Sequence, residues 1–232
     1  MKPLFFLHGF TGSAKLWDEI RNKLNFSTFA IDLPGHGQNQ FKDFLNPYTF
    51  DNWNEEFLSY INQQHSKKIN LCGYSMGGRL AISFADTHPN RIESLILVST
   101  TAGIKNNSKK KLNEDIELSA GIIEDYPKFI SYWENLDFFS KQKSRNCNGF
   151  KIQREIRLAQ NPKQLAFSLQ NFGKAFRGIG NLISKSKHSK KFNYTIGILL
   201  LLRIIWNQWY QHEIGQWNPE GSLPLHLCSF SA

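Results

Sequence analysis

The sequence predicts an α/β domain in which helices flank a parallel β-sheet. Short apolar runs typical of buried strands alternate with longer segments of helical periodicity along the first hundred residues. A Gly-x-Ser-x-Gly turn follows one of these runs and leads into a helical pattern, as in strand-to-helix connections of such sheets. At 232 residues, with 41% hydrophobic residues, the chain is long enough for one sizeable domain of this class.

The amino-acid composition limits which binding partners, cofactors and cellular location we expect for this chain. The net charge of +9 favours an anionic small molecule or a generally basic surface, and we expect no nucleic-acid partner. The three cysteines lack any C-x-x-C or metal-ligand spacing, so we expect no metal, no other cofactor and a reducing, cytoplasmic location. The apolar run Ile196–Trp206 is too short for a membrane span and is interrupted by Arg203.

The first elements follow from their apolar patterns. Residues Leu4–Leu7 form a continuous apolar run, which predicts a buried strand. Ser13 then precedes a helical pattern that continues to Leu24, and we expect its side chain to cap that helix. A second strand is expected over Phe26–Ile31.

The next elements repeat this alternation. A helix is predicted over Phe50–Gln64, because its apolar residues recur at helical spacing. Strands are expected over Lys68–Cys72 and Arg91–Ser99, and the residues Leu95–Val98 are expected to be fully buried. Strands and helices in this order indicate a parallel sheet with right-handed crossovers.

The stretch Gly73–Gly77 is the most informative motif. In a nucleophile elbow the central serine, here Ser75, sits in a strained backbone conformation that lifts its hydroxyl clear of the sheet. The five-residue pattern alone also fits a glycine-rich strand-to-helix turn without chemistry. Its context favours the elbow, because a strand precedes it, a helix follows it, and the loop His8–Gly9–Phe10 follows an earlier strand.

The pattern changes between residues 103 and 173. Amphipathic helices are predicted over Ile116–Phe139 and Ile152–Phe172, with no strand between them. We therefore expect a core of residues 1–173 with a helical lid inserted at about 103–173. The run Lys109–Lys111 is more typical of a solvated helix face than of a ligand site.

Several segments together resemble a known family, and they are Leu7–Ser13, Asp32–Gly37, Gly73–Arg79, Thr101–Ile104 and Asn161–Leu169. The chain resembles the α/β-hydrolase superfamily. More narrowly, it is similar to the 2-succinyl-6-hydroxy-2,4-cyclohexadiene-1-carboxylate synthases of menaquinone and phylloquinone biosynthesis. The likeness covers Met1 to about Gly173, and the pair Tyr74 and Arg79 is its most specific part.

The resemblance implies a lyase reaction at the elbow. In this family, pyruvate is eliminated from 2-succinyl-5-enolpyruvyl-6-hydroxy-3-cyclohexene-1-carboxylate after a base removes a proton. Ser75 would be the reactive serine, and the backbone N–H groups of Phe10 and Met76 would stabilise negative charge on the succinyl carbonyl. Each such donor is typically worth about 3–4 kcal/mol.

The resemblance also implies a binding site for a small polycarboxylate. Tyr74, Arg79, Trp133 and Arg157 match substrate-contacting residues of the family, and a guanidinium pairs well with a carboxylate. Simple lid packing for Trp133 and an exposed helix position for Arg157 are the alternatives. Where the family has a third arginine, near Lys110 or Lys111, this chain has lysine.

After Gly173 the resemblance ends. The family continues with strands that supply an aspartate and a Gly-His motif, which a catalytic serine needs as orienter and base. Here Asp137 is the last aspartate, and glycine precedes none of His188, His212 and His226. We therefore expect residues 174–232 to be an atypical tail, in which the C-terminal strands are incomplete or replaced. A change of reading frame near residues 173–178 would explain it, and a diverged functional terminus is the competing explanation.

Three functions therefore remain open. The Tyr74 and Arg79 pair favours the synthase reaction on a carboxylated substrate. Another α/β-hydrolase activity, on carboxylic esters or carbon–carbon bonds, would use the same elbow. A truncated, non-catalytic remnant would explain the missing aspartate and histidine.

Overall fold

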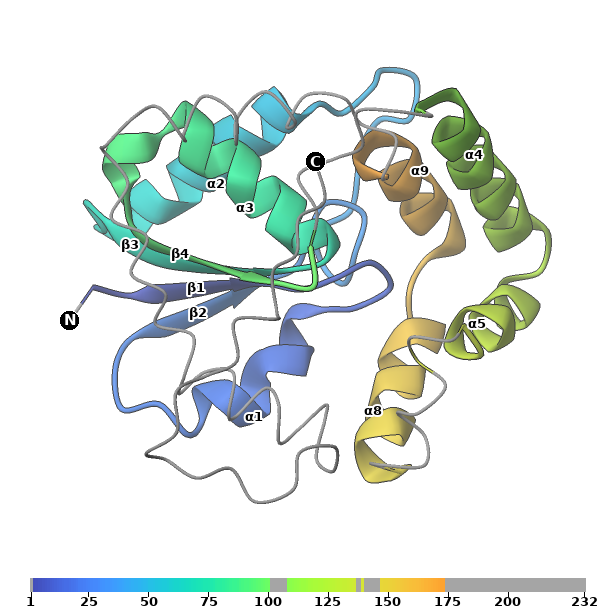
Figure 1. Ribbon diagram of the computed structural model, residues 1–232, viewed down its shortest axis with the longest axis horizontal. Helices are drawn as coiled ribbons and strands as arrows, with labels where there is room; N and C mark the ends of the chain where they lie inside the picture. Colours follow the sequence, from blue (N-terminus) through green and yellow to red (C-terminus); the bar gives the residue numbers. More distant parts are fainter. Residues whose placement is uncertain (1, 101–107, 137–138, 140–146, 174–232) are drawn as a thin grey trace, which may run out of the picture.

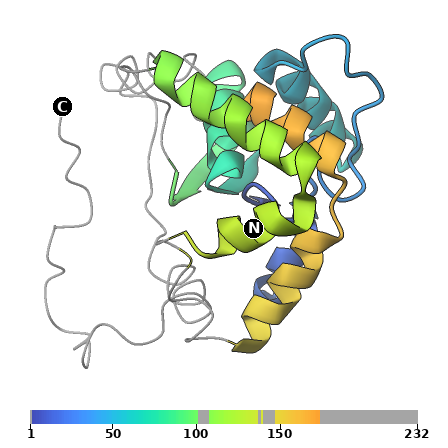
Figure 2. The same cartoon turned by 90° about the vertical axis from the view of Figure 1, so that its right-hand side faces the viewer.

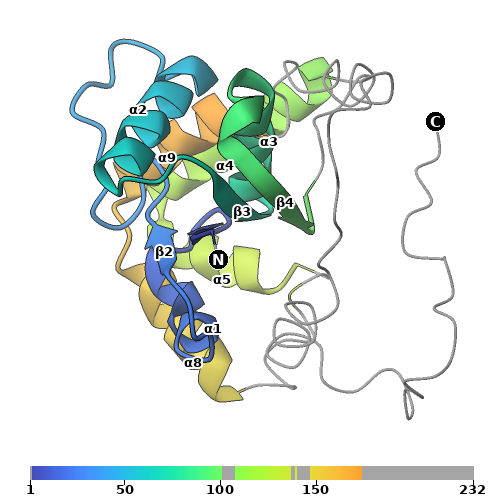
Figure 3. The same cartoon turned by 90° about the vertical axis from the view of Figure 1, so that its left-hand side faces the viewer.

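The computed structural model describes residues 2–100, 108–136, 139 and 147–173, and these form a parallel sheet covered by helices (Figure 1). The strands are β1 (Leu4–Leu7), β2 (Thr28–Ile31), β3 (Ile69–Tyr74) and β4 (Ile92–Val98). Their order across the sheet is β2-β1-β3-β4, and every pairing is parallel. Figure 3 shows β2 and β4 at opposite edges of the described sheet. The predicted fold class is confirmed.

Residues of β1 alternate between two apolar cores. Phe5 and Leu7 belong to the larger core, on the side where α2 (Phe50–Gln63) and α3 (Met76–Thr87) cover the sheet. Leu4 and Phe6 belong to the smaller core on the opposite face. All four side chains are buried, which explains why β1 is a continuous apolar run rather than an alternating one.

The first helical segment differs from its prediction. It consists of a 3₁₀ turn, η1 (Ala14–Trp17), followed by one turn of α-helix, α1 (Asp18–Arg21), and it does not continue to Leu24 as a helix. The Ser13 side chain makes no capping hydrogen bond. The backbone N–H of Ala14 instead donates to Asp32 Oδ1 at 2.7 Å, so this segment is held by the loop after β2.

The burial predicted for β4 is also wrong. Only Ile92 and Val98 of this strand are buried, and Leu97 is 42% exposed. Among the strands that the structure describes, β4 has one neighbour, β3, and lies at an edge. A short 3₁₀ turn, η2 (Pro89–Arg91), connects it to α3.

The segment predicted to form a lid, which we continue to call the lid, contains more helices among its described residues than the sequence suggests. Each predicted amphipathic helix corresponds to a pair: α4 (Ser108–Glu124) with α5 (Tyr126–Glu134), and α8 (Cys147–Leu158) with α9 (Pro162–Phe172). The breaks fall at Asp125 and Asn161. Each of these side chains accepts a hydrogen bond from the first turn of the next helix, which begins with proline near its start.

The four lid helices of the described residues lie beyond the carboxyl ends of β1 and β3 in Figure 1, and they lie in front in Figure 2, which looks at the molecule from that side. Apolar residues of α4, α5 and α9 join the larger core, which is therefore continuous from the sheet into the lid. None of the helices in the described ranges is long and apolar enough to cross a membrane. The predicted atypical tail, residues 174–232, lies outside the described residues.

Candidate active site

The turn between β3 and α3 has the geometry of a nucleophile elbow. Ser75 lies between them with φ 52° and ψ −112°, a conformation that costs a non-glycine residue on the order of 1–3 kcal/mol. Two contacts support the strained backbone. The Ser75 N–H donates to the carbonyl of Val98 at 2.9 Å, and the Thr100 hydroxyl donates to the Ser75 carbonyl at 2.7 Å. The residue as a whole is only partly buried.

Two glycines allow the loop after β1 to lie directly against the elbow. A Cβ on Gly77 would stand 2.4 Å from the carbonyl oxygen of His8, and the Gly77 N–H donates to that same oxygen at 3.1 Å. A Cβ on Gly9 would stand 2.7 Å from the Tyr74 ring and 3.3 Å from Cβ of Ser75. The chain at Phe10 therefore passes beside the elbow. We call residues 8–13 the oxyanion loop.

Met76 is the residue whose backbone N–H the sequence predicts as the second donor, and that role stays a prediction. It is the first residue of α3, where a backbone N–H has no carbonyl partner within the helix. Its side chain is fully buried, so the start of α3 is fixed in the core. This leaves the N-terminal end of α3 next to Ser75 as a place for developing negative charge.

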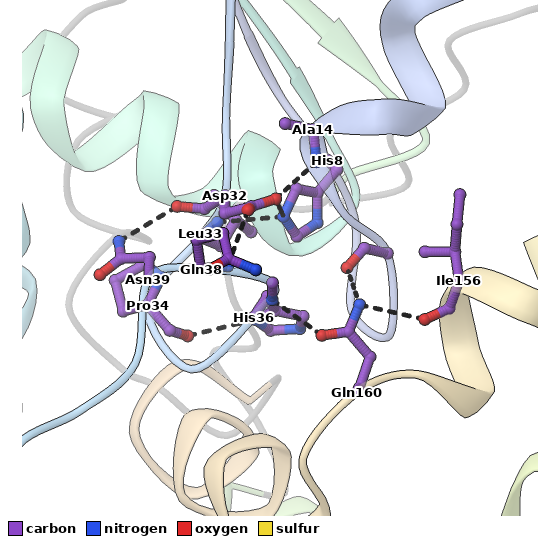
Figure 4. Close-up of polar contacts among 12 residues, drawn as sticks. His8, Ala14, Asp32, Leu33, Pro34, His36, Gln38, Asn39, Ile156 and Gln160 are labelled. Atoms are coloured by element: carbon purple, nitrogen blue, oxygen red, sulfur yellow. Dashed lines mark hydrogen bonds and ion pairs between the residues drawn. The ribbon is translucent and has the colours of Figure 1, made fainter.

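Two buried histidines hold the loops around the elbow (Figure 4). Burial lowers the pKa of His8 to about 4 and that of His36 to about 3, so both rings are neutral at pH 7. The Nε2 atom of His8 accepts from the Leu33 N–H at 3.0 Å, and that of His36 accepts from the Thr11 N–H at 3.3 Å. Because both acceptor atoms are occupied, neither histidine is available as the base for Ser75.

A small cavity with a volume of about 20 Å³ lies between the oxyanion loop and the lid. Of the predicted site residues, it brings together Phe10, Tyr74 and Arg157. Phe139 and Gln153 from the lid complete the lining on that side. One cavity therefore joins the neighbour of Ser75, the oxyanion loop and a lid cation.

Arg157 is held in place by polar partners on the lid. Its guanidinium donates to Glu134 Oε1 and to Gln153 Oε1, each at 3.1 Å, and lies 5.0 Å from the centre of the Phe139 ring. Burial lowers its pKa, and the nearby Glu134 carboxylate opposes that shift. Glu134 also pairs with Arg154, so two guanidinium groups share one carboxylate. A net positive charge remains, which favours an anionic ligand.

Trp133 lies next to this cavity rather than in its lining. Its ring is 5.5 Å from that of Phe10, edge to face, and it stacks on Phe129 at 5.8 Å. It also contacts Phe139 at 5.9 Å. These contacts agree with lid packing, and the substrate contact that the resemblance implies stays a prediction.

Arg79 has a different environment from the one expected of a substrate ligand. It is 5% exposed, and its Nε and Nη2 atoms donate to the carbonyl of Phe172 at 3.2 Å and 2.7 Å. Burial lowers its pKa to about 10, and the negative charge of Asp115 opposes that shift. The guanidinium thus binds the last residue of α9, where a cation is favourable. It does not belong to the lining of the cavity described above.

Sequence reasoning missed Glu134, Gln153 and Gln160. Gln153 stands four residues before Arg157 on α8, so helical spacing could have paired them. Glu134 lies on α5 and reaches Arg157 only through the packing of two helices, for which the sequence carries no local signal.

Comparison with known proteins agrees with this geometry. A family model described as the alpha/beta hydrolase fold matches residues 2–211. A Bacillus subtilis protein assigned as 2-succinyl-6-hydroxy-2,4-cyclohexadiene-1-carboxylate synthase is 37% identical over 172 residues, which is 72% of this chain and 62% of that protein. The chain thus spans less than two thirds of this relative. A pimeloyl-[acyl-carrier protein] methyl ester esterase of Nitrosospira multiformis is 35% identical over 103 residues, 42% of this chain and 38% of the esterase.

Among solved structures, that of MenH from S. aureus is similar, with a TM-score of 0.73 and 30% identity. The alignment covers 81% of this chain and 71% of MenH. The parallel sheet, the strained Ser75 and the family match over residues 2–211 point to one conclusion. The chain belongs to the alpha/beta hydrolase fold family.

Proposed function

We propose that this chain is a carbon–oxygen lyase that eliminates pyruvate from 2-succinyl-5-enolpyruvyl-6-hydroxy-3-cyclohexene-1-carboxylate. The observation that carries the proposal is the position of Arg157, a buried cation in the cavity that Tyr74 and Phe10 also line. Arg157 shares its anionic partner, Glu134, with Arg154, so one carboxylate faces two guanidinium groups. The positive charge that remains can bind a carboxylate of the substrate, whereas a site for neutral esters has no use for it. The name of the Bacillus subtilis relative, a synthase of 2-succinyl-6-hydroxy-2,4-cyclohexadiene-1-carboxylate, supports this reaction by naming its product.

The proposed reaction assigns a role to each group. A base removes a ring proton, the carbon–oxygen bond to the enolpyruvyl group breaks as the ring gains a double bond, and the released enolate takes up a proton to become pyruvate. Negative charge that develops on the succinyl carbonyl is stabilised by the N–H groups of Phe10 and Met76. Arg157 binds a substrate carboxylate, with the Tyr74 hydroxyl as a further polar contact. Ser75 lies beside this carbonyl as the reactive hydroxyl.

The cavity is small compared with the proposed substrate. A volume of about 20 Å³ holds roughly one water molecule, far less than a substituted cyclohexene ring. The cavity lies between the oxyanion loop on the sheet and residues of the lid such as Phe139 and Gln153. We infer that the lid side of this cavity moves outward when substrate binds.

An ester or carbon–carbon bond hydrolase is the second candidate. It is supported by the 35% identity to the methyl ester esterase, although that match covers less than half of either protein. A non-catalytic remnant is the third, because neither buried histidine of the described residues is available as a base for Ser75. Both would lack a preference for a carboxylated cyclohexene.

The test is a calorimetric titration of the full chain, in its Ser75→Ala form, with the proposed substrate. We expect saturable binding that weakens at least about tenfold in Arg157→Met, since breaking a buried charged contact costs on the order of 2–5 kcal/mol. Arg154→Met is the matched control. Arg154 shares Glu134 with Arg157 but lies outside the cavity lining, so this variant should bind nearly as the parent does.

Two results would contradict the proposal. One is absence of binding in a chain that circular dichroism shows to be folded. The other is equal binding by the parent and Arg157→Met, or tighter binding of a neutral methyl ester of the same substrate. Either would favour the hydrolase or the remnant.

A further inference from the structure

The oxyanion loop is a strained turn that depends on support from outside itself. The Gly12 N–H donates to the Gly9 carbonyl at 3.1 Å, which closes the turn around Phe10. Thr11 in this turn has φ 64°, in the left-handed region that a β-branched residue rarely adopts. Its side chain is 1% exposed, so water does not stabilise the turn. Neighbouring groups must therefore hold the Phe10 backbone in position.

One support comes from the loop after β2. The Thr11 N–H donates to His36 Nε2 at 3.3 Å, and His36 Nδ1–H donates to the Pro34 carbonyl at 3.1 Å. This arrangement fixes a single tautomer of a neutral ring. The position of the Thr11 amide, next to that of Phe10, thus depends on where the 34–37 segment stands.

The second support comes from the lid, through the side chain of Gln160. Gln160 lies in the short linker between α8 and α9 and is 8% exposed. Its Nε2 atom donates to the Gly12 carbonyl at 2.9 Å and to the Ile156 carbonyl at 3.2 Å. Its Oε1 atom accepts from the Gly37 N–H at 2.8 Å. Figure 4 shows this amide between the His36 segment and the oxyanion loop.

These three bonds also fix the orientation of the amide. The oxygen meets an N–H and the nitrogen meets two carbonyls, so a flipped amide would oppose like groups on every side. One side chain of the lid therefore holds both loops that determine where the Phe10 N–H points. It contacts Gly12 directly, and it reaches Thr11 through Gly37 and His36.

We propose that Gln160 is a positioning residue that couples the seating of the lid to the geometry of the oxyanion loop. When the lid side of the cavity moves outward, the Gly12 and Gly37 contacts loosen together and the Phe10 amide loses its alignment with Ser75. When the lid returns over bound substrate, the alignment is restored. The catalytic part of this inference rests on the proposed function of the Phe10 N–H.

Gln164 offers a matched control. It lies in the first turn of α9, is 6% exposed, and uses its amide in the same way. Its Oε1 atom accepts from the Phe41 N–H at 2.7 Å and its Nε2 atom donates to the Phe41 carbonyl at 3.0 Å. Both glutamines are thus buried bridges from the lid to the core, and Gln160 is the one bonded to the oxyanion loop.

The experiment compares full-length wild type with Gln160→Leu, Gln160→Glu and Gln164→Leu by two measurements. The first is the rate at which a fluorophosphonate labels Ser75, a reaction in which the serine oxygen bonds to phosphorus, its proton goes to solvent and fluoride leaves. The second is hydrogen exchange of the Thr11 and Gly12 amides, read by mass spectrometry. Both are made at a temperature where circular dichroism shows every variant to be folded.

Gln160→Leu should slow labelling by about tenfold or more, since small misplacements of catalytic groups are costly, and should speed exchange at Thr11 and Gly12. Gln160→Glu keeps the acceptor for the Gly37 N–H but has no donor for the Gly12 carbonyl. Its labelling rate and its exchange rates should therefore lie between those of wild type and Gln160→Leu. Gln164→Leu should lower thermal stability and leave labelling within about twofold of wild type. Equal labelling and equal exchange in Gln160→Leu and Gln164→Leu would overturn the proposal.

Failure of the proposed function would be seen separately. If wild type is not labelled at all, Ser75 is not a working nucleophile, and the exchange measurement alone decides the coupling. Unchanged exchange at Thr11 and Gly12 in both Gln160 variants would then reject it. Faster exchange in those variants, absent in Gln164→Leu, would uphold it.

Discussion

Two residues at the elbow and its facing loop have strained backbone conformations, and hydrogen bonds from neighbouring segments hold them in place. Ser75 and Thr11 both have positive φ values, 52° and 64°, and they lie in segments that face each other. The backbone groups on both sides of this contact are hydrogen-bonded to β4, to His36 or to Gln160. Strain at two facing positions is thus maintained by contacts from three different elements.

The buried histidines make stability depend on pH. Burial lowers the pKa of His8 to about 4 and of His36 to about 3, from the 6.5 of an unperturbed histidine. Between pH 6.5 and the lowered pKa of each ring, that histidine is protonated in the unfolded chain but neutral in the folded chain. The stability is therefore fully present above pH 6.5 and is lost as the pH falls through this window, by about 1.4 kcal/mol for each unit of pKa difference.

Urea unfolding at pH 8, 6.5 and 5 checks this prediction. We expect the free energy of unfolding to fall by at least about 2 kcal/mol between pH 8 and 5. His65→Asn is the control, because His65 is exposed and asparagine tolerates its positive φ of 52°. A stability that stays flat from pH 8 to pH 5 would mean that His8 and His36 are not buried as described.

At the scale of elements, α3 and the end of α9 are joined by one side chain. The Arg79 guanidinium on α3 donates twice to the carbonyl of Phe172, the last residue of α9. Phe172 itself is fully buried in the larger core. Through this contact the helix that follows Ser75 is fixed to α9.

Replacing Arg79 should therefore reduce stability as well as any affinity for carboxylates. Arg79→Ala leaves the Phe172 carbonyl without its donor, which should cost about 1–3 kcal/mol in the free energy of unfolding. Arg79→Lys retains a cation near Asp115 and one flexible donor, so its loss should be smaller. Chemical denaturation measures both. An Arg79→Ala protein as stable as wild type would show that the contact with Phe172 contributes nothing.

Most elements could be predicted from the sequence because their signals are local. The strand Leu4–Leu7 has the bounds expected from its apolar pattern, and the helix predicted over Phe50–Gln64 begins at Phe50 and ends one residue earlier, at Gln63. The extent of the helix after Ser13 could not be predicted, because the first N–H of that segment is bound by Asp32, which is distant in sequence. The burial of Leu95–Val98 failed for a similar reason, since it depends on which strand pairs beside β4.

The candidate site was predicted only where a motif marks it. The elbow and its oxyanion loop have short sequence signatures, and the strained Ser75 turn that they predict is present. The packing of α5 on α8 brings Glu134 to Arg157, and the α8–α9 linker brings Gln160 to Gly12. These contacts join residues more than twenty positions apart in the sequence, so no local sequence pattern predicts them.

For the whole molecule, the lid and the sheet form one continuous core with a cationic cavity at their junction. The larger core runs from Phe5 on β1 through α3 to Ile130 and Phe172 in the lid. Arg157 contributes the buried positive charge at the cavity, and the lining on the sheet side includes Tyr74, the residue before Ser75, but not Ser75 itself. This arrangement is what the central claim, pyruvate elimination from a carboxylated cyclohexene, requires.

The most direct test of that claim is pyruvate release by the full chain, measured with a lactate dehydrogenase coupled assay. We expect slow release, because neither buried histidine of the described residues is available as a base and glycine precedes none of the histidines after residue 173, unlike in the Gly-His motif of the family. This release should be abolished in Ser75→Ala and reduced at least about tenfold in Arg157→Met. Arg154→Met should release pyruvate at nearly the wild-type rate. Release that does not depend on Ser75, or hydrolysis of a neutral ester that outpaces it, would contradict the account.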